Sequence, residues 1–86
     1  MSYLTEYEPE ALTDLAKLDQ FICNRIIKKI NWLAENFEQI TPQPLTADLS
    51  GFFKLRVGDY RVIYEFDREE KTIFIDRVKH RREVYD

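Results

Sequence analysis

The sequence predicts a single α+β domain in which two N-terminal helices pack on a small antiparallel sheet. Three observations predict this fold. Apolar residues recur at helical spacing in the N-terminal half, they alternate with polar residues after Gly51, and Gly58–Asp59 separates two alternating runs as a tight hairpin turn does. Because 86 residues can bury only one thin core, residues 1–86 are expected to form one domain.

The N-terminal half is expected to contribute one strand and both helices. Ser2–Tyr7 alternates and predicts a strand, after which Pro9 suits the first turn of a helix that ends near Leu18. Asp19 is a good N-cap for a longer second helix that ends near Asn36. The apolar stripe of this helix has the spacing of a core-facing surface and comprises Ile22, Ile26, Ile30, Leu33 and Phe37.

The C-terminal half is expected to supply the rest of the sheet. An irregular connection, Glu38–Ser50, precedes the change to period-two patterning. Two alternating runs then flank Gly58–Asp59, and a second turn at Asp67–Lys71 leads to a last strand, Thr72–Val78. The predicted order of elements is therefore β-α-α-β-β-β.

The hairpin carries an unusual arrangement of charge. If its loop is Gly58–Asp59, Arg56 faces Arg61 across the strand pair, and Lys54 shares their face. The opposite face is apolar and comprises Phe53, Leu55, Val57, Tyr60, Val62 and Tyr64. Like charges directly across a strand pair destabilise it, so the pair needs a reason. Two explanations are open: the basic side chains form a solvated face, or they bind a polyanion such as a phosphodiester. The hairpin alone does not decide between these explanations.

The charge distribution places any anion site in the C-terminal half. The net charge of −3 argues against a general nucleic-acid binder, but residues 51–86 hold nine basic and eight acidic side chains, against four and eight in residues 1–50. Lys79-His80-Arg81-Arg82 is the densest basic cluster. The His, Arg and Tyr side chains of this ending offer a proton carrier, a charge clamp and a second hydrogen-bond partner, which suit phosphoryl transfer that needs no metal or cofactor. No metal-ligand spacing, glycine-rich phosphate loop or Ser/His/Asp arrangement competes with this interpretation.

The chain is expected to be cytoplasmic and not to associate with a membrane. Cys23 is the only cysteine, so no internal disulfide can form, and the N-terminus lacks the basic and apolar regions of a signal peptide. No segment is as long and apolar as a membrane-spanning helix. Trp32 falls beside the apolar stripe of the second helix, and we interpret it as a helix–sheet or partner contact and not as a ring on which a nucleic-acid base stacks.

The residues Leu49–Tyr64, which include LRVGDYRVIY, and the ending Val78–Tyr85, which includes HRREVY, resemble the RelE/ParE toxin superfamily. The similarity is greatest to RelE-type mRNA interferases, the toxins of type II toxin–antitoxin systems. It implies a microbial-RNase-like fold and cleavage of mRNA in the ribosomal A site, with attack by a 2′-hydroxyl that leaves a 2′,3′-cyclic phosphate. It also implies a cognate antitoxin protein and, through the antitoxin complex, binding to operator DNA.

The resemblance assigns catalytic roles to five residues. Lys54 is expected to transfer a proton or contact phosphate, Arg61 to clamp the scissile phosphate, and Arg81 to stabilise the transition state. His80 is expected to act as a general acid or base, and Tyr85 to stack on a base or orient the attacking hydroxyl. Further contacts with RNA phosphates are expected from Arg56, Lys79 and Arg82.

Two other functions fit the same sequence. A ParE-like toxin shares the fold but inhibits gyrase instead of cutting RNA, and it does not need the basic and aromatic ending. A catalytically weak module would keep the fold only to bind antitoxin and operator DNA. The low net charge and Phe52, which stands where the best-known active relatives carry a second lysine, favour the weak module.

Overall fold

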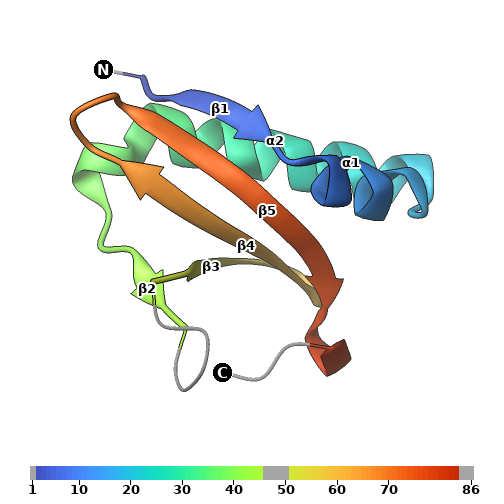
Figure 1. Ribbon diagram of the computed structural model, residues 1–86. Coiled ribbons are helices and arrows are strands. Elements are labelled where there is room, and N and C mark those ends of the chain that lie inside the picture. The colour runs from blue at the N-terminus through green and yellow to red at the C-terminus, as the bar shows by residue number, and fades with distance from the viewer. Residues whose placement is uncertain (1, 46–50, 84–86) are drawn as a thin grey trace.

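The computed structural model describes residues 2–45 and 51–83 and confirms the predicted α+β fold, with two helices followed by most of the sheet (Figure 1). The elements in chain order are β1 (Leu4–Tyr7), α1 (Pro9–Ala16), α2 (Gln20–Asn36), the 3-10 turn η1 (Phe37–Gln39), β2 (Gln43–Pro44), β3 (Phe53–Val57), β4 (Tyr60–Asp67), β5 (Thr72–His80) and the 3-10 turn η3 (Arg81–Glu83).

The sheet has five strands in the order β1-β5-β4-β3-β2. The strands from β2 to β5 are antiparallel as expected, whereas β1 pairs parallel with β5 at one edge. Two details extend the prediction. The connection after α2 contributes the short edge strand β2, and β5 continues beyond Val78 because Lys79 and His80 still pair with Arg61 and Tyr60.

Both helices begin where the sequence predicts. Pro9 occupies the first turn of α1, and the Asp19 side chain accepts a hydrogen bond of 3.0 Å from the Ile22 N–H at the start of α2. The helix α1 ends at Ala16, slightly before the predicted Leu18. No helix in the described part of the chain is long and apolar enough to cross a membrane.

The core lies between α2 and one face of the sheet. The helix buries Ile26, Ile30, Leu33 and Ala34, and the sheet buries Val62, Tyr64, Ile73 and Ile75. Phe37, which is fully buried after the helix, packs its ring 4.8 Å from the rings of both Tyr3 and Phe66. Figure 1 shows the helices on this one side of the strands, so the other face of β3, β4 and β5 carries no helix in the described residues.

A carboxylate joins α1 to the sheet where β1 ends. The Glu8 N–H, just after β1, donates to the Ile75 carbonyl of β5 at 2.9 Å, and further along β5 the Val78 N–H donates to Asp14 Oδ2 at 2.9 Å. Arg77 also donates to this carboxylate, from Nε at 2.9 Å and from Nη2 at 3.2 Å. Burial alone would raise the pKa of Asp14, but the bonds from Arg77 and Val78 outweigh it, and the pKa is lowered.

Candidate functional site

Three basic residues form a row across the open face of the sheet. The predicted hairpin register is confirmed, with Arg56 opposite Arg61 on β3 and β4, and Lys79 of β5 lies opposite Arg61 on its other side. Residues directly opposite in a sheet share a face, and their neighbours Val57 and Val62 belong to the core. Arg56, Arg61 and Lys79, called the basic row below, therefore lie on the sheet face opposite the core, and Arg56 also borders a hollow that α2 lines.

Arg61 lies at the centre of the basic row and is half-buried. Its Nη1 atom is buried and finds no hydrogen-bond partner within residues 2–45 and 51–83. A buried guanidinium nitrogen without an acceptor costs free energy, and the nearby Arg56 and Lys79 add repulsion. A bound anion would remove both costs, and a phosphate matches the forked geometry of arginine.

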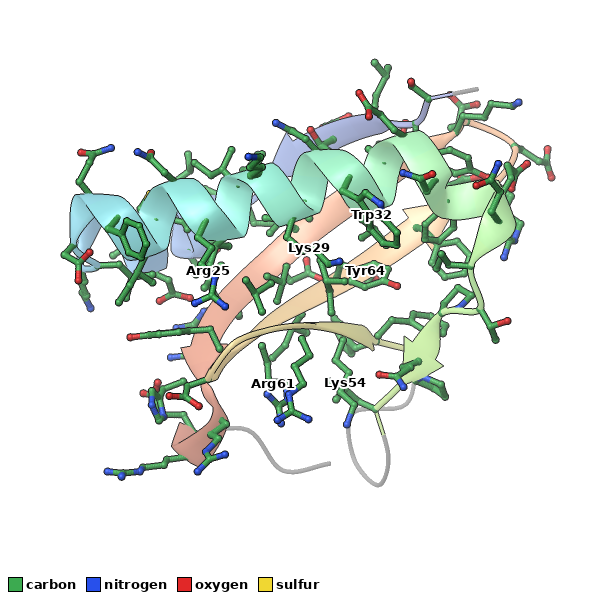
Figure 2. The ribbon with its side chains drawn as sticks, turned by 180° about the vertical axis from the view of Figure 1, so that it is seen from behind. Arg25, Lys29, Trp32, Lys54, Arg61 and Tyr64 are labelled. Carbon is green, nitrogen blue, oxygen red and sulfur yellow. The ribbon has the colours of Figure 1, made fainter. Side chains whose placement is uncertain are left out.

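The next residues along the strands bring Lys54 near the basic row. Lys54 of β3 faces Ile63 of β4, and Ile63 faces Arg77 of β5. Figure 2 shows Lys54 and Arg61 directed to the same side, away from α2. Arg77 is held by Asp14, so its charge is already balanced. Lys54, Ile63 and Arg77 thus form a second row beside the basic row, in which Lys54 lies on the same face of the sheet as Arg61.

Arg81 is brought to the hairpin turn by η3. Its backbone N–H donates to the Asp59 carbonyl at 2.7 Å, and its Nη1 lies 3.9 Å from Asp59 Oδ1. Both side chains of this ion pair are more than half exposed, so the pair contributes little to stability and leaves the guanidinium accessible. Arg82 is also exposed. Tyr85 lies outside the described residues.

The structure does not bring His80 to the basic row. His80 lies opposite Tyr60, a residue of the core face, and the two rings are 5.3 Å apart in an edge-to-face arrangement. The Nδ1 atom of His80 accepts a hydrogen bond of 3.2 Å from the backbone N–H of Arg82, and the backbone N–H of His80 donates to Glu83 Oε1. His80 therefore organises η3 in this conformation, while Lys79 next to it points to the other face.

An acidic pair that the sequence did not predict lies beyond the second row. A bulge between Ile63 and Tyr64 inserts Asp76 into β5, near Glu65. Burial, then hydrogen bonding and repulsion from Glu65, raise the pKa of Asp76 to about 7. Phe52 lines the hollow beside this pair, which measures about 460 Å³ and also includes Glu8 and Glu10. The open face thus changes from basic to acidic along the strands.

A second group of cations lies on the other side of β3, along α2. Arg25, Lys28, Lys29 and Trp32 line a hollow of about 440 Å³, with Arg56, Val57 and Gly58 of the hairpin opposite them. Figure 2 shows Arg25, Lys29 and Trp32 on the side of α2 that faces the hairpin. This group was not predicted from the sequence, although its spacing of i, i+3, i+4 and i+7 places all four residues on one helical face. No set of three His, Cys, Asp or Glu side chains within the described ranges is arranged to hold a metal ion.

The comparisons with known proteins agree with this fold. A family model described as the ParE toxin of type II toxin–antitoxin systems, parDE, matches residues 5–85. The chain therefore belongs to the RelE/ParE superfamily of type II toxin–antitoxin toxins, as its sequence predicted.

Individual relatives are similar over almost the whole chain. Toxin RelG of Mycobacterium tuberculosis is 32% identical over 85 residues, which cover 99% of this chain and 98% of the relative. The toxin–antitoxin complex RelBE2 of the same organism contains a chain that is 31% identical, with a TM-score of 0.83 and coverage of 93% and 92%. The archaeal RelE–RelB complex of Pyrococcus horikoshii OT3 contains one that is 26% identical, with a TM-score of 0.74 and coverage of 94% and 97%.

Proposed function

We propose that this toxin is a ribosome-dependent endoribonuclease that cuts mRNA in the A site without a metal ion. The observation that carries the proposal is the basic row, with a buried and unsatisfied arginine nitrogen at its centre in the described structure. In the reaction the 2′-oxygen forms a bond to phosphorus while the bond from phosphorus to the 5′-oxygen breaks. The products are a 2′,3′-cyclic phosphate and a 5′-hydroxyl.

Each basic side chain has a role that follows from its place. Arg61 binds the non-bridging oxygens of the scissile phosphate, and their charge grows in the transition state, so the contact strengthens there. Arg56 and Lys79 hold the same or adjacent phosphates from either side. Lys54 donates to the phosphate or moves a proton at the reacting oxygens.

The end of the chain completes the proposed site. Arg81 of η3 adds a third guanidinium beside the hairpin turn once it exchanges the exposed Asp59 for the RNA, and Arg82 contacts flanking phosphate. Tyr85 stacks on a base or orients the attacking hydroxyl, the role that the family resemblance implies. His80 positions η3 and thereby Arg81, and it transfers a proton only if its ring leaves Tyr60.

The proposed partners are those of a type II toxin in the cytoplasm. The two similar solved structures are complexes of toxin with antitoxin, which supports a cognate antitoxin for this chain. We expect an acidic amphipathic segment of the antitoxin to cover the basic row or to displace the C-terminal residues. Operator DNA is reached through the antitoxin complex.

The direct test adds purified toxin to translating ribosomes and maps the mRNA ends. The wild type is expected to cut at defined codon positions, and Arg61→Ala and Arg81→Ala each to slow cutting on the order of a hundredfold or more. Arg68→Ala is the matched control, because Arg68 is an exposed arginine in the turn after β4 and pairs with Glu38. Unchanged cutting in both site variants would refute the assignment.

Inhibition of DNA gyrase is the second candidate function. The observation that favours it is that the matching family model carries the ParE description. A supercoiling assay with purified gyrase separates the two functions, because a gyrase inhibitor leaves transcripts intact. If wild type affects neither ribosomes nor gyrase yet binds antitoxin and operator DNA, the chain is a binding module.

A further inference from the structure

The hollow between α2 and the β3–β4 hairpin, called the α2 groove below, has a lining that is basic and aromatic. Four of its seven lining residues are cations, namely Arg25, Lys28, Lys29 and Arg56, and none is acidic. In a chain whose net charge is −3, this concentration of one sign is unexpected. Three of the four basic residues of the N-terminal half are gathered here.

Within the part of the chain that the structure describes, no ion pair neutralises the charges of the α2 groove. Lys29 instead places Nζ 4.0 Å from the centre of the Trp32 ring, and the Arg25 guanidinium lies over the backbone of Gly58. Trp32 remains 41% exposed. Unpaired cations beside an exposed aromatic ring are the components that single-stranded RNA sites use.

The α2 groove is joined to the basic row by Arg56. This residue lines the groove and also lies opposite Arg61 in the sheet. The strand β2 pairs with β3 only at Phe53 and Lys54. At Leu55–Val57, in the described structure, β3 therefore has no further strand on its outer side, and β3 alone separates the groove from the open face of the sheet. A polyanion bound at Arg61 can therefore continue around β3 into the groove.

We propose that the α2 groove is a second RNA-binding surface, which holds the phosphodiester backbone of the mRNA segment next to the one bound at Arg61. This inference rests on the proposed ribonuclease function and adds the path of the substrate beyond the cut. The phosphates contact Arg25 and Lys28, and a base of the flanking segment packs beside Trp32.

The chain provides a local reporter for this proposal. Trp32 is its only tryptophan, so a ligand in the groove changes the fluorescence of a single known residue. The probe is a single-stranded 2′-O-methyl RNA oligonucleotide, which cannot be cut because the attacking hydroxyl is blocked. Oligonucleotides long enough to pass from Arg61 to the groove are expected to shift Trp32 emission, whereas a dinucleotide is not.

The variant Arg25→Gln/Lys28→Gln removes two charges and retains most of the length of the side chains. It is expected to bind the long oligonucleotide roughly tenfold or more weakly, since a binding free energy weaker by about 1.4 kcal/mol corresponds to tenfold. The slope of log K against log salt should become shallower by about 0.7 for each phosphate that the variant no longer binds. Lys17→Gln is the matched control, because Lys17 is exposed at the end of α1 and does not line the groove.

The outcomes separate this proposal from the proposed function. If the double variant binds RNA like the wild type while Arg61→Ala stops cutting on ribosomes, the groove proposal is overturned and the ribonuclease assignment stands. If the wild type does not cut mRNA at all, the ribonuclease assignment fails, whatever the groove binds. A glutamate peptide of equal charge that shifts Trp32 emission where RNA does not would identify a protein-docking site and overturn the proposal.

Discussion

Replacing Asp14 by alanine tests the contact that joins α1 to the sheet. Asp14 is 8% exposed and accepts three hydrogen bonds, two from Arg77 and one from the Val78 N–H. Removing the carboxylate leaves the Val78 N–H without an acceptor, which costs about 1–3 kcal/mol. The Arg77 side chain is 40% exposed, so water can hydrate its guanidinium once Asp14 is gone. The loss of the ion pair therefore costs less than the roughly 3–5 kcal/mol that breaking a fully buried pair costs.

The expected total is a decrease of about 3 kcal/mol in the free energy of unfolding, which lowers Tm by on the order of 15 °C in a domain of this size. The assay is equilibrium unfolding in urea near pH 7, repeated near pH 3. Because the pKa of Asp14 is lowered in the folded state, its contribution is fully present above the unfolded pKa of 3.8 and is lost as the pH falls through the folded-state pKa. The difference in unfolding free energy between the wild type and Asp14→Ala should therefore be smaller near pH 3 than near pH 7.

Asp19→Ala provides the comparison, because it removes an exposed N-cap carboxylate worth about 1 kcal/mol. If Asp14→Ala costs no more than this control at pH 7, the three hydrogen bonds do not join α1 to the sheet as described. An equal deficit at both pH values would show that the effect comes from poorer packing and not from the charge.

Three further predictions concern the sheet. Asp76→Asn should raise the free energy of unfolding by roughly 1–2 kcal/mol at pH 8 and change it little at pH 4. The reason is that the folded-state pKa of Asp76 is about 7, so the wild type loses stability as the pH rises from 4 to 8. Urea unfolding measures both values, and an equal effect of the substitution at the two pH values would disprove this. Arg61→Ala should leave Tm level or higher while cutting falls, since it relieves repulsion with Arg56, and a fall of many degrees would show a structural role. Gly58→Ala should cost about 1 kcal/mol or more in urea unfolding, because φ is +58° and a Cβ would lie 3.2 Å from the Arg25 guanidinium; a neutral effect would contradict the strain.

Local patterns in the sequence were sufficient to predict the hairpin and the pairing of Arg56 with Arg61, but not the place of Lys79 beside Arg61 in the basic row. A period of two and a Gly-Asp turn allow a single register, which places Arg56 opposite Arg61. The same alternation, continued to the true end of β5, separates His80 from Lys79. The sequence-based site grouped His80 with the arginines because they are adjacent in the chain, whereas the strand extends to His80 and turns it toward Tyr60.

The remaining features depend on contacts between distant parts of the chain. Asp14 and Arg77 are 63 positions apart, and nothing local indicates that α1 ends beside β5. The parallel pairing of the edge strand β1 with β5 also joins distant segments, whereas the bulge at Asp76 interrupts the pairing of the consecutive strands β4 and β5. The α2 groove is similar, because helical spacing groups Arg25 with Lys28 but does not reveal that the hairpin lies opposite them.

The chemistry of the cut ends is the most direct test of the claim that the basic row performs phosphoryl transfer. The measurement isolates mRNA fragments from ribosomes treated with wild-type toxin and identifies the group at each new 3′ end. A 2′,3′-cyclic phosphate that forms with the wild type, and forms on the order of a hundredfold more slowly with Arg61→Ala, is the predicted result. Fragments that end in a plain 3′-hydroxyl, or cyclic phosphate ends that form with Arg61→Ala as fast as with the wild type, would contradict it.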